Sequence, residues 1–283
     1  MGNLRTLLIL GRTSNLPTVW SNCLAGWLLG GGGAPERFIQ LCAGATSLYL
    51  GGMFLNDAFD ARFDHEHRRE RPIPAGAISV TEVWKWGFGW LLAGLLCLAP
   101  LGGTTVLLAG LLIANIVIYD AMHKRITFSP LIMAGCRFFL YLVAASAAAD
   151  GVTGLAIWSA FALAAYIVGL SYLARFESVP GVLRYWPCLF LAGPVLLALL
   201  VNAGPYRASG AVLSLLLATW ILRCLRFTFD QSMRNIGRTV SGLLAGIVLV
   251  DLLAVAGGTA TLAIVFVALF VTALLAQRFV PAT

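Results

Sequence analysis

The sequence predicts an all-α protein, a polytopic bundle of nine or ten membrane-spanning helices. Of its 283 residues, 60% are hydrophobic and 11% are charged, whereas an ordinary soluble domain is about 45–50% apolar and about 25% charged. The apolar residues form long runs, each close to the roughly 20 residues that a helix needs to cross a bilayer. Polar residues lie in short segments between these runs, without the alternation that β-barrel strands show.

Taken in order, the apolar runs predict the individual spans. They cover residues 15–33, 38–57, 83–100, 103–120, 130–149, 153–172, 187–203, 209–228, 238–256 and 259–279. Only Gly257, Gly258 and their neighbours separate the last two runs, so nine spans with a broken final helix is the alternative. Arg12 and Asn15 interrupt the first apolar run, so no cleavable signal peptide is expected. With no long hydrophilic stretch, residues 1–283 are expected to form a single membrane domain.

The basic residues predict the orientation, because Lys and Arg accumulate on the cytoplasmic side. With the N-terminus inside, all but Arg37, Arg137 and Arg207 of the 19 Lys and Arg residues fall in inner segments. We therefore expect a multi-pass protein of the bacterial inner membrane with a cytoplasmic N-terminus. The same topology explains the net charge of +7, and no basic arm indicates a nucleic-acid partner. The six cysteines are scattered and are expected to act as small hydrophobic residues.

The longest polar segment, residues 56–76, follows the second predicted span. Asn56, Asp60 and Asp64 share a spacing of four residues, and Asp57 follows Asn56. If the span stays helical, these groups lie on one face at its cytoplasmic end. Carboxylates this close repel one another unless a cation neutralises them, and oxygen ligands favour Mg²⁺ together with substrate phosphates. Arginines that would suit the remaining diphosphate charge follow at positions 68, 69 and 71. The alternative is a solvated, salt-bridged loop.

The motif Asn-Asp-x-x-Asp-x-x-x-Asp at 56–64, followed by Arg-Pro-Ile-Pro-x-Gly at 71–76, resembles the first signature of the UbiA superfamily of intramembrane prenyltransferases. Residues 119–125 resemble the inner loop of that family after its fourth span, which often carries a Tyr and a Lys-Arg pair. The spacing of the spans fits along essentially the whole chain. The resemblance implies that Asp57, Asp60 and Asp64 bind a Mg²⁺–diphosphate group with support from Asn56. It also implies a set of diphosphate-holding residues: Arg68, Arg71, Tyr119, Lys124 and Arg125.

The chain departs from the family after the sixth predicted span, where members usually carry a second Asp-rich motif. Residues 169–178 hold one acid, Glu177, which is expected to remain as a metal ligand. Tyr172 and Arg175 are expected to contact substrate, because a guanidinium can hold phosphate directly. The alternative is a basic inner loop with an incidental ion pair. Together with residues 135–137, the extra C-terminal span and residues 276–278, this loop resembles the EboC-like branch, which is associated with moving or modifying a precursor at the membrane.

Arg137 places a charge inside the fifth predicted span, about two turns below the inner surface. Such a charge is costly in lipid and almost always faces a bundle interior or a water-filled cavity. We expect Arg137 to join Asp57, Asp60 and Asp64 as a catalytic residue that reaches the acceptor or the diphosphate. The alternative is snorkelling towards the interface.

The resemblance implies a Mg²⁺-dependent transfer of a polyprenyl group from an isoprenyl diphosphate to a small acceptor, aromatic by family default. The partners expected are therefore a polyprenyl diphosphate, a small acceptor molecule and the lipid bilayer. A catalytically weakened carrier or lipid-precursor-binding protein is the alternative, since the second acidic motif is reduced. An ion-coupled transporter ranks last, because the spans are nearly free of charge apart from Arg137. The acceptor, the prenyl chain length and the oligomeric state stay open.

Overall fold

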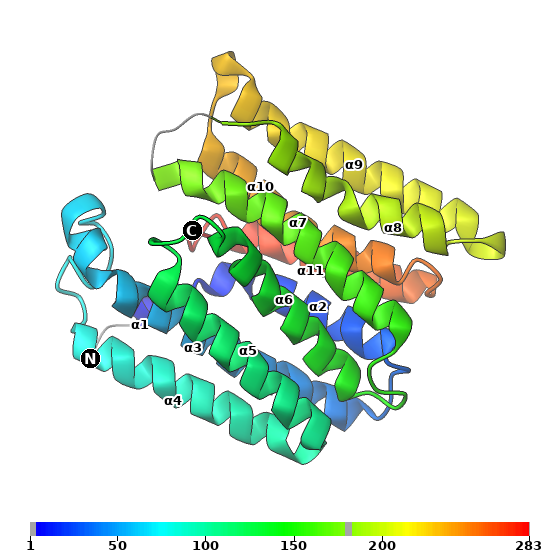
Figure 1. The fold of residues 1–283 in the computed structure, drawn as a ribbon, viewed down its shortest axis with the longest axis horizontal. Coiled ribbons are helices and arrows are strands. Elements are labelled where there is room, and N and C mark those ends of the chain that lie inside the picture. The colour runs from blue at the N-terminus through cyan, green and yellow to red at the C-terminus, as the bar shows by residue number, and fades with distance from the viewer. Residues whose placement is uncertain (1–3, 179–182, 283) are drawn as a thin grey trace.

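Helices running side by side make up the computed structural model, which describes residues 4–178 and 183–282 (Figure 1). No strand occurs within these two ranges. The α-helices are α1 (Leu4–Leu10), α2 (Leu16–Leu29), α3 (Pro35–His67), α4 (Val80–Leu98), α5 (Gly103–Met122), α6 (Ser129–Ser146), α7 (Gly154–Ser178), α8 (Gly193–Val201), α9 (Arg207–Phe229), α10 (Ile236–Ala254) and α11 (Ala260–Ala276). Short 3₁₀ turns lie between them: η1 (Thr13–Asn15), η2 (Ala99–Leu101), η3 (Trp186–Ala192), η4 (Gly204–Tyr206) and η5 (Gln231–Met233). The predicted all-α bundle is confirmed.

Seven of the described helical segments are long and apolar enough to cross a membrane. They are Pro35–His67, Val80–Leu101, Gly103–Met122, Ser129–Ser146, Gly154–Glu177, Gly204–Phe229 and Ile236–Ala254. The other three predicted spans fall on shorter helices. The run 15–33 shrinks to α2, because glycines with positive φ follow at 31–33 and end the helix. The run 187–203 is divided into η3 and α8, each with a proline in its first turn.

The last two predicted spans are separate helices that fold back on one another. Helix α10 ends at Ala254 and α11 begins at Ala260. The side-chain amide of Gln277, just after α11, donates to the Ser241 carbonyl near the start of α10 at 3.1 Å. The two helices are therefore antiparallel, which favours ten traverses of the bundle over nine with a broken final helix.

Helix α3 is fixed in place by unusually close packing against α4. Gly44 and Gly51 on α3 face Gly94 and Gly87 on α4. A Cβ atom added at Gly51 would lie 2.8 Å from Leu91 Cδ2 and 2.9 Å from the Gly87 carbonyl oxygen. Small residues let two helix backbones approach in this way where hydrophobic burial adds little, as in a membrane. The packing holds the 33-residue α3, and with it the acidic end of that helix, in one position.

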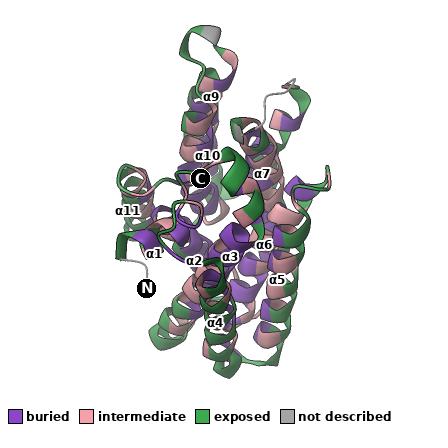
Figure 2. Ribbon diagram, turned by 90° about the vertical axis from the view of Figure 1, so that its left-hand side faces the viewer, coloured by how far each residue is buried: buried purple, intermediate pink, exposed green. Residues whose placement is uncertain are grey.

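Figure 2 shows buried residues in the interior of the bundle and exposed residues on its outward faces. Large apolar side chains on the outward faces are exposed, among them Leu96 on α4, Leu200 on α8 and Leu215 on α9. Water would not favour so much exposed apolar surface, whereas lipid hydrocarbon would. The interior holds both the hydrophobic contacts of the bundle and a set of buried polar groups.

Candidate active site

A cavity of about 880 Å³ lies among α3, α5, α6, α7 and α10, with Arg12 and Asn15 of the segment before α2 also in its wall. Its wall is polar where α3 ends and largely apolar elsewhere. Most of the residues predicted for the site line it: Asn56, Asp60, Asp64, Arg68, Arg71, Tyr119, Lys124, Arg137, Tyr172, Arg175 and Glu177. Asp57 and Arg125 are not among the lining residues. Asp57 is buried behind the wall, and Arg125 is exposed after α5.

The acidic row forms because α3 continues as a helix to His67, well beyond the apolar run that predicted it. Asn56, Asp57, Asp60 and Asp64 then lie on successive turns, and all four are buried. Burying carboxylates requires compensating charge. In this row each carboxylate has a cationic neighbour from another part of the chain.

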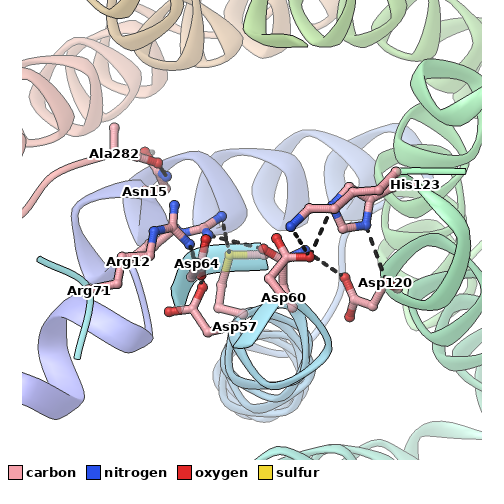
Figure 3. A network of polar contacts seen from close by, with 12 residues as sticks. Arg12, Asn15, Asp57, Asp60, Asp64, Arg71, Asp120, His123 and Ala282 are labelled. Carbon is pink, nitrogen blue, oxygen red and sulfur yellow. Dashed lines mark hydrogen bonds and ion pairs between the residues drawn. The ribbon is translucent and has the colours of Figure 1, made fainter. Parts of the chain in front are cut away.

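The cations approach the row from two sides (Figure 3). On one side, Asp57 Oδ1 accepts from Arg12 Nη2 at 3.0 Å and from Arg71 Nη1 at 2.9 Å. The same Arg71 nitrogen lies 3.6 Å from Asp64 Oδ2. On the other side, Lys124 Nζ lies 2.7 Å from Asp60 Oδ1. These pairs leave the row close to neutral overall.

Arg12 reaches the row from the segment before α2. Its backbone has φ 40° and ψ 50°, the left-handed conformation that residues other than glycine rarely adopt. The guanidinium donates to Asn56 Oδ1 as well as to Asp57, and the Arg12 carbonyl accepts from the Tyr49 hydroxyl at 3.2 Å. Burial opposes the charge, yet Asp57 keeps the pKa of Arg12 above its ordinary value. Burial and the neighbouring Arg12 hold the pKa of Arg71 below its ordinary value.

The C-terminal end of α5 contributes two groups that the sequence did not single out, Asp120 on the helix and His123 directly after it. Asp120 Oδ1 accepts from Asn56 Nδ2 at 3.1 Å, and its buried Oδ2 atom has no hydrogen-bond partner among the residues that the structure describes. His123 Nε2 lies 3.5 Å from Asp60 Oδ1. Both residues fall inside the stretch 119–125 that resembles the family loop, three residues apart and so on one helix face. That spacing could have identified them. No local pattern pointed to Arg12 as the partner of Asp57.

The end of α7 lines the same cavity with different chemistry. Arg175 is exposed and donates through Nη1 to the Thr127 carbonyl at 2.8 Å. The Tyr172 hydroxyl accepts from the Arg184 backbone N–H at 2.8 Å. Glu177 is the acid of this segment and is also exposed. Where the family typically has a second acidic motif, this chain therefore has one acid together with Arg175 and Tyr172, and Arg175 and Glu177 are exposed.

Arg137 points into the bundle rather than to an interface. Its guanidinium donates to Asn22 Oδ1 at 2.7 Å and to Thr18 Oγ1 at 3.0 Å, both on α2. The structure therefore does not support the snorkelling alternative. Asn22 in turn donates to Asp251 Oδ2 on α10 at 2.7 Å, which ties three helices together through buried polar groups.

The acidic row fits a Mg²⁺ ion only in part. In the described ranges, no three acidic, histidine or cysteine side chains converge closely enough to hold a metal by themselves. Asp60 and Asp64 do present carboxylates to the cavity. Mg²⁺ is commonly held by one or two carboxylates with phosphate oxygens and water completing its shell. The donor set therefore fits an ion that arrives with a diphosphate, while Asp57 is engaged by two arginines.

Residues 16–238 match the profile of the UbiA prenyltransferase family. The chain belongs to this family. Seven apolar helices and family membership together make it a multi-pass integral membrane protein. The predicted family is confirmed, while its EboC-like branch stays a prediction.

Two curated UbiA-type relatives show how the family varies. The digeranylgeranylglyceryl phosphate synthase of Methanoregula boonei is 31% identical over 120 residues, which cover 41% of this chain and 42% of the relative. The 4-hydroxybenzoate octaprenyltransferase of Salmonella paratyphi B is 28% identical over 167 residues, which cover 58% of this chain and 55% of the relative. The chain thus spans about half the length of the curated relatives that it matches.

A solved UbiA homologue shares the fold. The structure from Archaeoglobus fulgidus bound to GPP and Mg²⁺ superimposes with a TM-score of 0.54 and 14% sequence identity, covering 97% of both chains. At that identity the likeness concerns the fold, and the helices described above are the UbiA arrangement.

Proposed function

We propose that this UbiA-family protein is a Mg²⁺-dependent prenyltransferase, which transfers a polyprenyl group from an isoprenyl diphosphate to a small acceptor. One observation carries the proposal: Asp60 and Asp64 line a cavity of about 880 Å³ whose remaining wall is largely apolar. A diphosphate needs the polar end and a prenyl tail needs the apolar part. The names of the two curated relatives and the GPP and Mg²⁺ of the Archaeoglobus homologue agree with this substrate class.

The cations at the polar end would hold the diphosphate. Lys124 and Arg71 are already positioned by Asp60 and by Asp57 and Asp64, so they need little reorganisation to contact phosphate oxygens. Arg68 and Arg175 line the same region of the cavity and add positive charge. Mg²⁺, when bound through Asp60 and Asp64, would supply further neutralisation of the diphosphate.

Transfer would break the C–O bond between the prenyl carbon and the diphosphate, with the bonding electrons leaving on the diphosphate oxygen. The prenyl carbon would bond to the acceptor, and the acceptor would release a proton to the diphosphate or to water. Arg71 and Lys124 would stabilise the charge that grows on the leaving group. The apolar lining around Ile116 and Ile167 would keep water away from the prenyl carbon.

We also propose the finer location. The basic inner segments favour a cytoplasmic N-terminus and a cytoplasmic acidic row, in the bacterial inner membrane. The whole chain would act as one domain, because the residues that line the cavity range from position 12 to position 282.

A carrier that binds a lipid precursor without cleaving it is the second candidate. The reduction of the α7 wall to a single acid, Glu177, favours it. Such a protein would bind a prenyl diphosphate and release no free diphosphate.

The test is diphosphate release from the purified, detergent-solubilised chain given geranylgeranyl diphosphate, with and without Mg²⁺ and with 4-hydroxybenzoate as an acceptor. We expect Mg²⁺-dependent release that is lost in Asp60→Asn. Glu66→Gln is the matched control, because Glu66 is an exposed acid on the same helix and does not line the cavity. Binding without release across a panel of prenyl chain lengths and acceptors would favour the carrier.

A further inference from the structure

Arg137 is a charged group in the apolar part of the cavity. It lies eight residues after Ser129, the first residue of α6, which is roughly 12 Å along the helix axis. Met133 and Leu140, one turn away on either side, also line the cavity. A cation in such surroundings is expensive unless it meets an anion, and in a membrane protein it marks a functional position.

Uncharged groups hold the guanidinium in place. Nη1 donates to Asn22 Oδ1 at 2.7 Å and to the Thr18 carbonyl at 3.3 Å, and Nη2 donates to Thr18 Oγ1 at 3.0 Å. An arginine has five N–H donors. These three hydrogen bonds therefore leave two donors, Nε–H and one on Nη2, without a partner among the residues that the structure describes. Those two donors can form the fork that grips a carboxylate or a phosphate.

Asn22 is fixed from its other end. Its amide nitrogen donates to Asp251 Oδ2 at 2.7 Å, and the same oxygen accepts from the Ser21 hydroxyl at 2.5 Å. Asp251 is fully buried, and Asn22 lies between it and Arg137. The arrangement orients Arg137 through a neutral amide and leaves its charge available to a ligand.

We propose that Arg137, positioned by Asn22 and Thr18, binds the acidic group of the acceptor, so that the acceptor is a small molecule with a carboxylate or a phosphate. The inference rests on the proposed function, because it assigns one of the two substrates of that reaction. The diphosphate is left to Lys124 and Arg71 at the polar end. An anion at Arg137 would neutralise a buried charge where low polarity makes the attraction strong.

The test measures acceptor binding separately from the reaction. The full chain in detergent is titrated calorimetrically with 4-hydroxybenzoate, with its neutral analogue 4-hydroxybenzamide and with glycerol 1-phosphate. Each titration is run with and without prior saturation by Mg²⁺ and inorganic diphosphate. We expect at least one acid to bind about tenfold or more tightly than the amide, because charge-assisted hydrogen bonds add that much. Whichever acid binds identifies a carboxylate or a phosphate as the group recognised.

The variant Arg137→Gln should remove this preference for the acid while leaving the affinity for diphosphate within about twofold of wild type. Arg223→Gln is the matched control, because Arg223 is an exposed arginine on α9 outside the cavity. If Arg137→Gln does not fold, the comparison of acid with amide on the wild-type chain decides alone.

Three results would overturn the proposal: acids and amide binding equally to wild type, no acid binding at all, or an equal loss of acid and diphosphate affinity in Arg137→Gln. The last would assign Arg137 to the diphosphate. Failure of the proposed function would look different, since wild type would then bind acid normally but release no diphosphate from a prenyl diphosphate.

Discussion

The ends of α3 and α7 line one cavity but are built in opposite ways. At the end of α3 the acids are buried, and each lies against a cation that another segment supplies. At the end of α7, Arg175 and Glu177 are exposed, and Arg175 is held by a backbone carbonyl. The packed bundle fixes the side chains at the end of α3. The exposed side chains at the end of α7 are less constrained by the rest of the bundle.

This difference indicates which side chains are expected to affect both stability and activity. Buried ion pairs contribute little when intact but are costly to break, because the remaining charge has no partner. Exposed ones contribute little in either case. Substitutions at the end of α3 should therefore affect both folding and activity, and those at the end of α7 mainly activity.

The largest effect is expected when Asp57 is removed. Asp57→Ala leaves the partly buried Arg12 and Arg71 without their shared carboxylate, and should destabilise the chain by about 3–5 kcal/mol. Thermal unfolding in detergent measures it. Asp57→Asn keeps an acceptor of the same shape and should lose less. A loss no greater than that of Glu66→Ala, at an exposed site, would remove the distinction between the two walls.

The next largest difference between the ends of α3 and α7 is expected in enzymatic activity. Asp64→Asn should lower Mg²⁺-dependent diphosphate release by about 10²–10³-fold, the range seen when one charge-stabilising group is lost. Glu177→Gln, at the end of α7, should lower diphosphate release by about tenfold or less. Initial rates at saturating substrate compare the two. Equal losses would show that the α7 wall is as essential as the α3 wall.

Packing behind the acidic row should have a moderate effect. Gly51→Ala places a Cβ atom 2.8 Å from Leu91 Cδ2 and 2.9 Å from the Gly87 carbonyl oxygen, and should destabilise by about 1–3 kcal/mol. Gly89→Ala on α4 has no atom within 4 Å of its added Cβ and should be neutral or stabilising by up to about 1 kcal/mol. Similar unfolding temperatures for the two variants would argue against a rigid α3.

The smallest effect is expected at Arg175. Arg175→Ala removes an exposed hydrogen bond to the Thr127 carbonyl and should change stability by less than about 1 kcal/mol. Its effect should appear instead as a higher KM for the prenyl diphosphate. A large loss of stability would show that the end of α7 is as firmly determined as the end of α3.

The sequence predicted features that depend on local pattern. Apolar runs located most of the helices, and the spacing of Asn56, Asp60 and Asp64 correctly placed them on one helix face. The partners of these groups could not be predicted in this way. Arg12 meets Asp57 across 45 residues, and Asn56 meets Asp120 across 64, through contacts that only the packed bundle creates. The shortening of the first span likewise depended on which glycines adopt positive φ.

The backbone conformation of Arg12 restricts how this position can change over evolutionary time. A left-handed residue other than glycine carries a strain of order 1–2 kcal/mol. Glycine would relieve that strain but would leave the buried Asp57 without Arg12, and lysine would keep a charge but not the planar guanidinium whose Nη2 atom donates to both Asn56 and Asp57. Each single substitution exchanges one defect for another. We therefore expect position 12 to remain arginine unless Asp57 is also substituted in the same lineage.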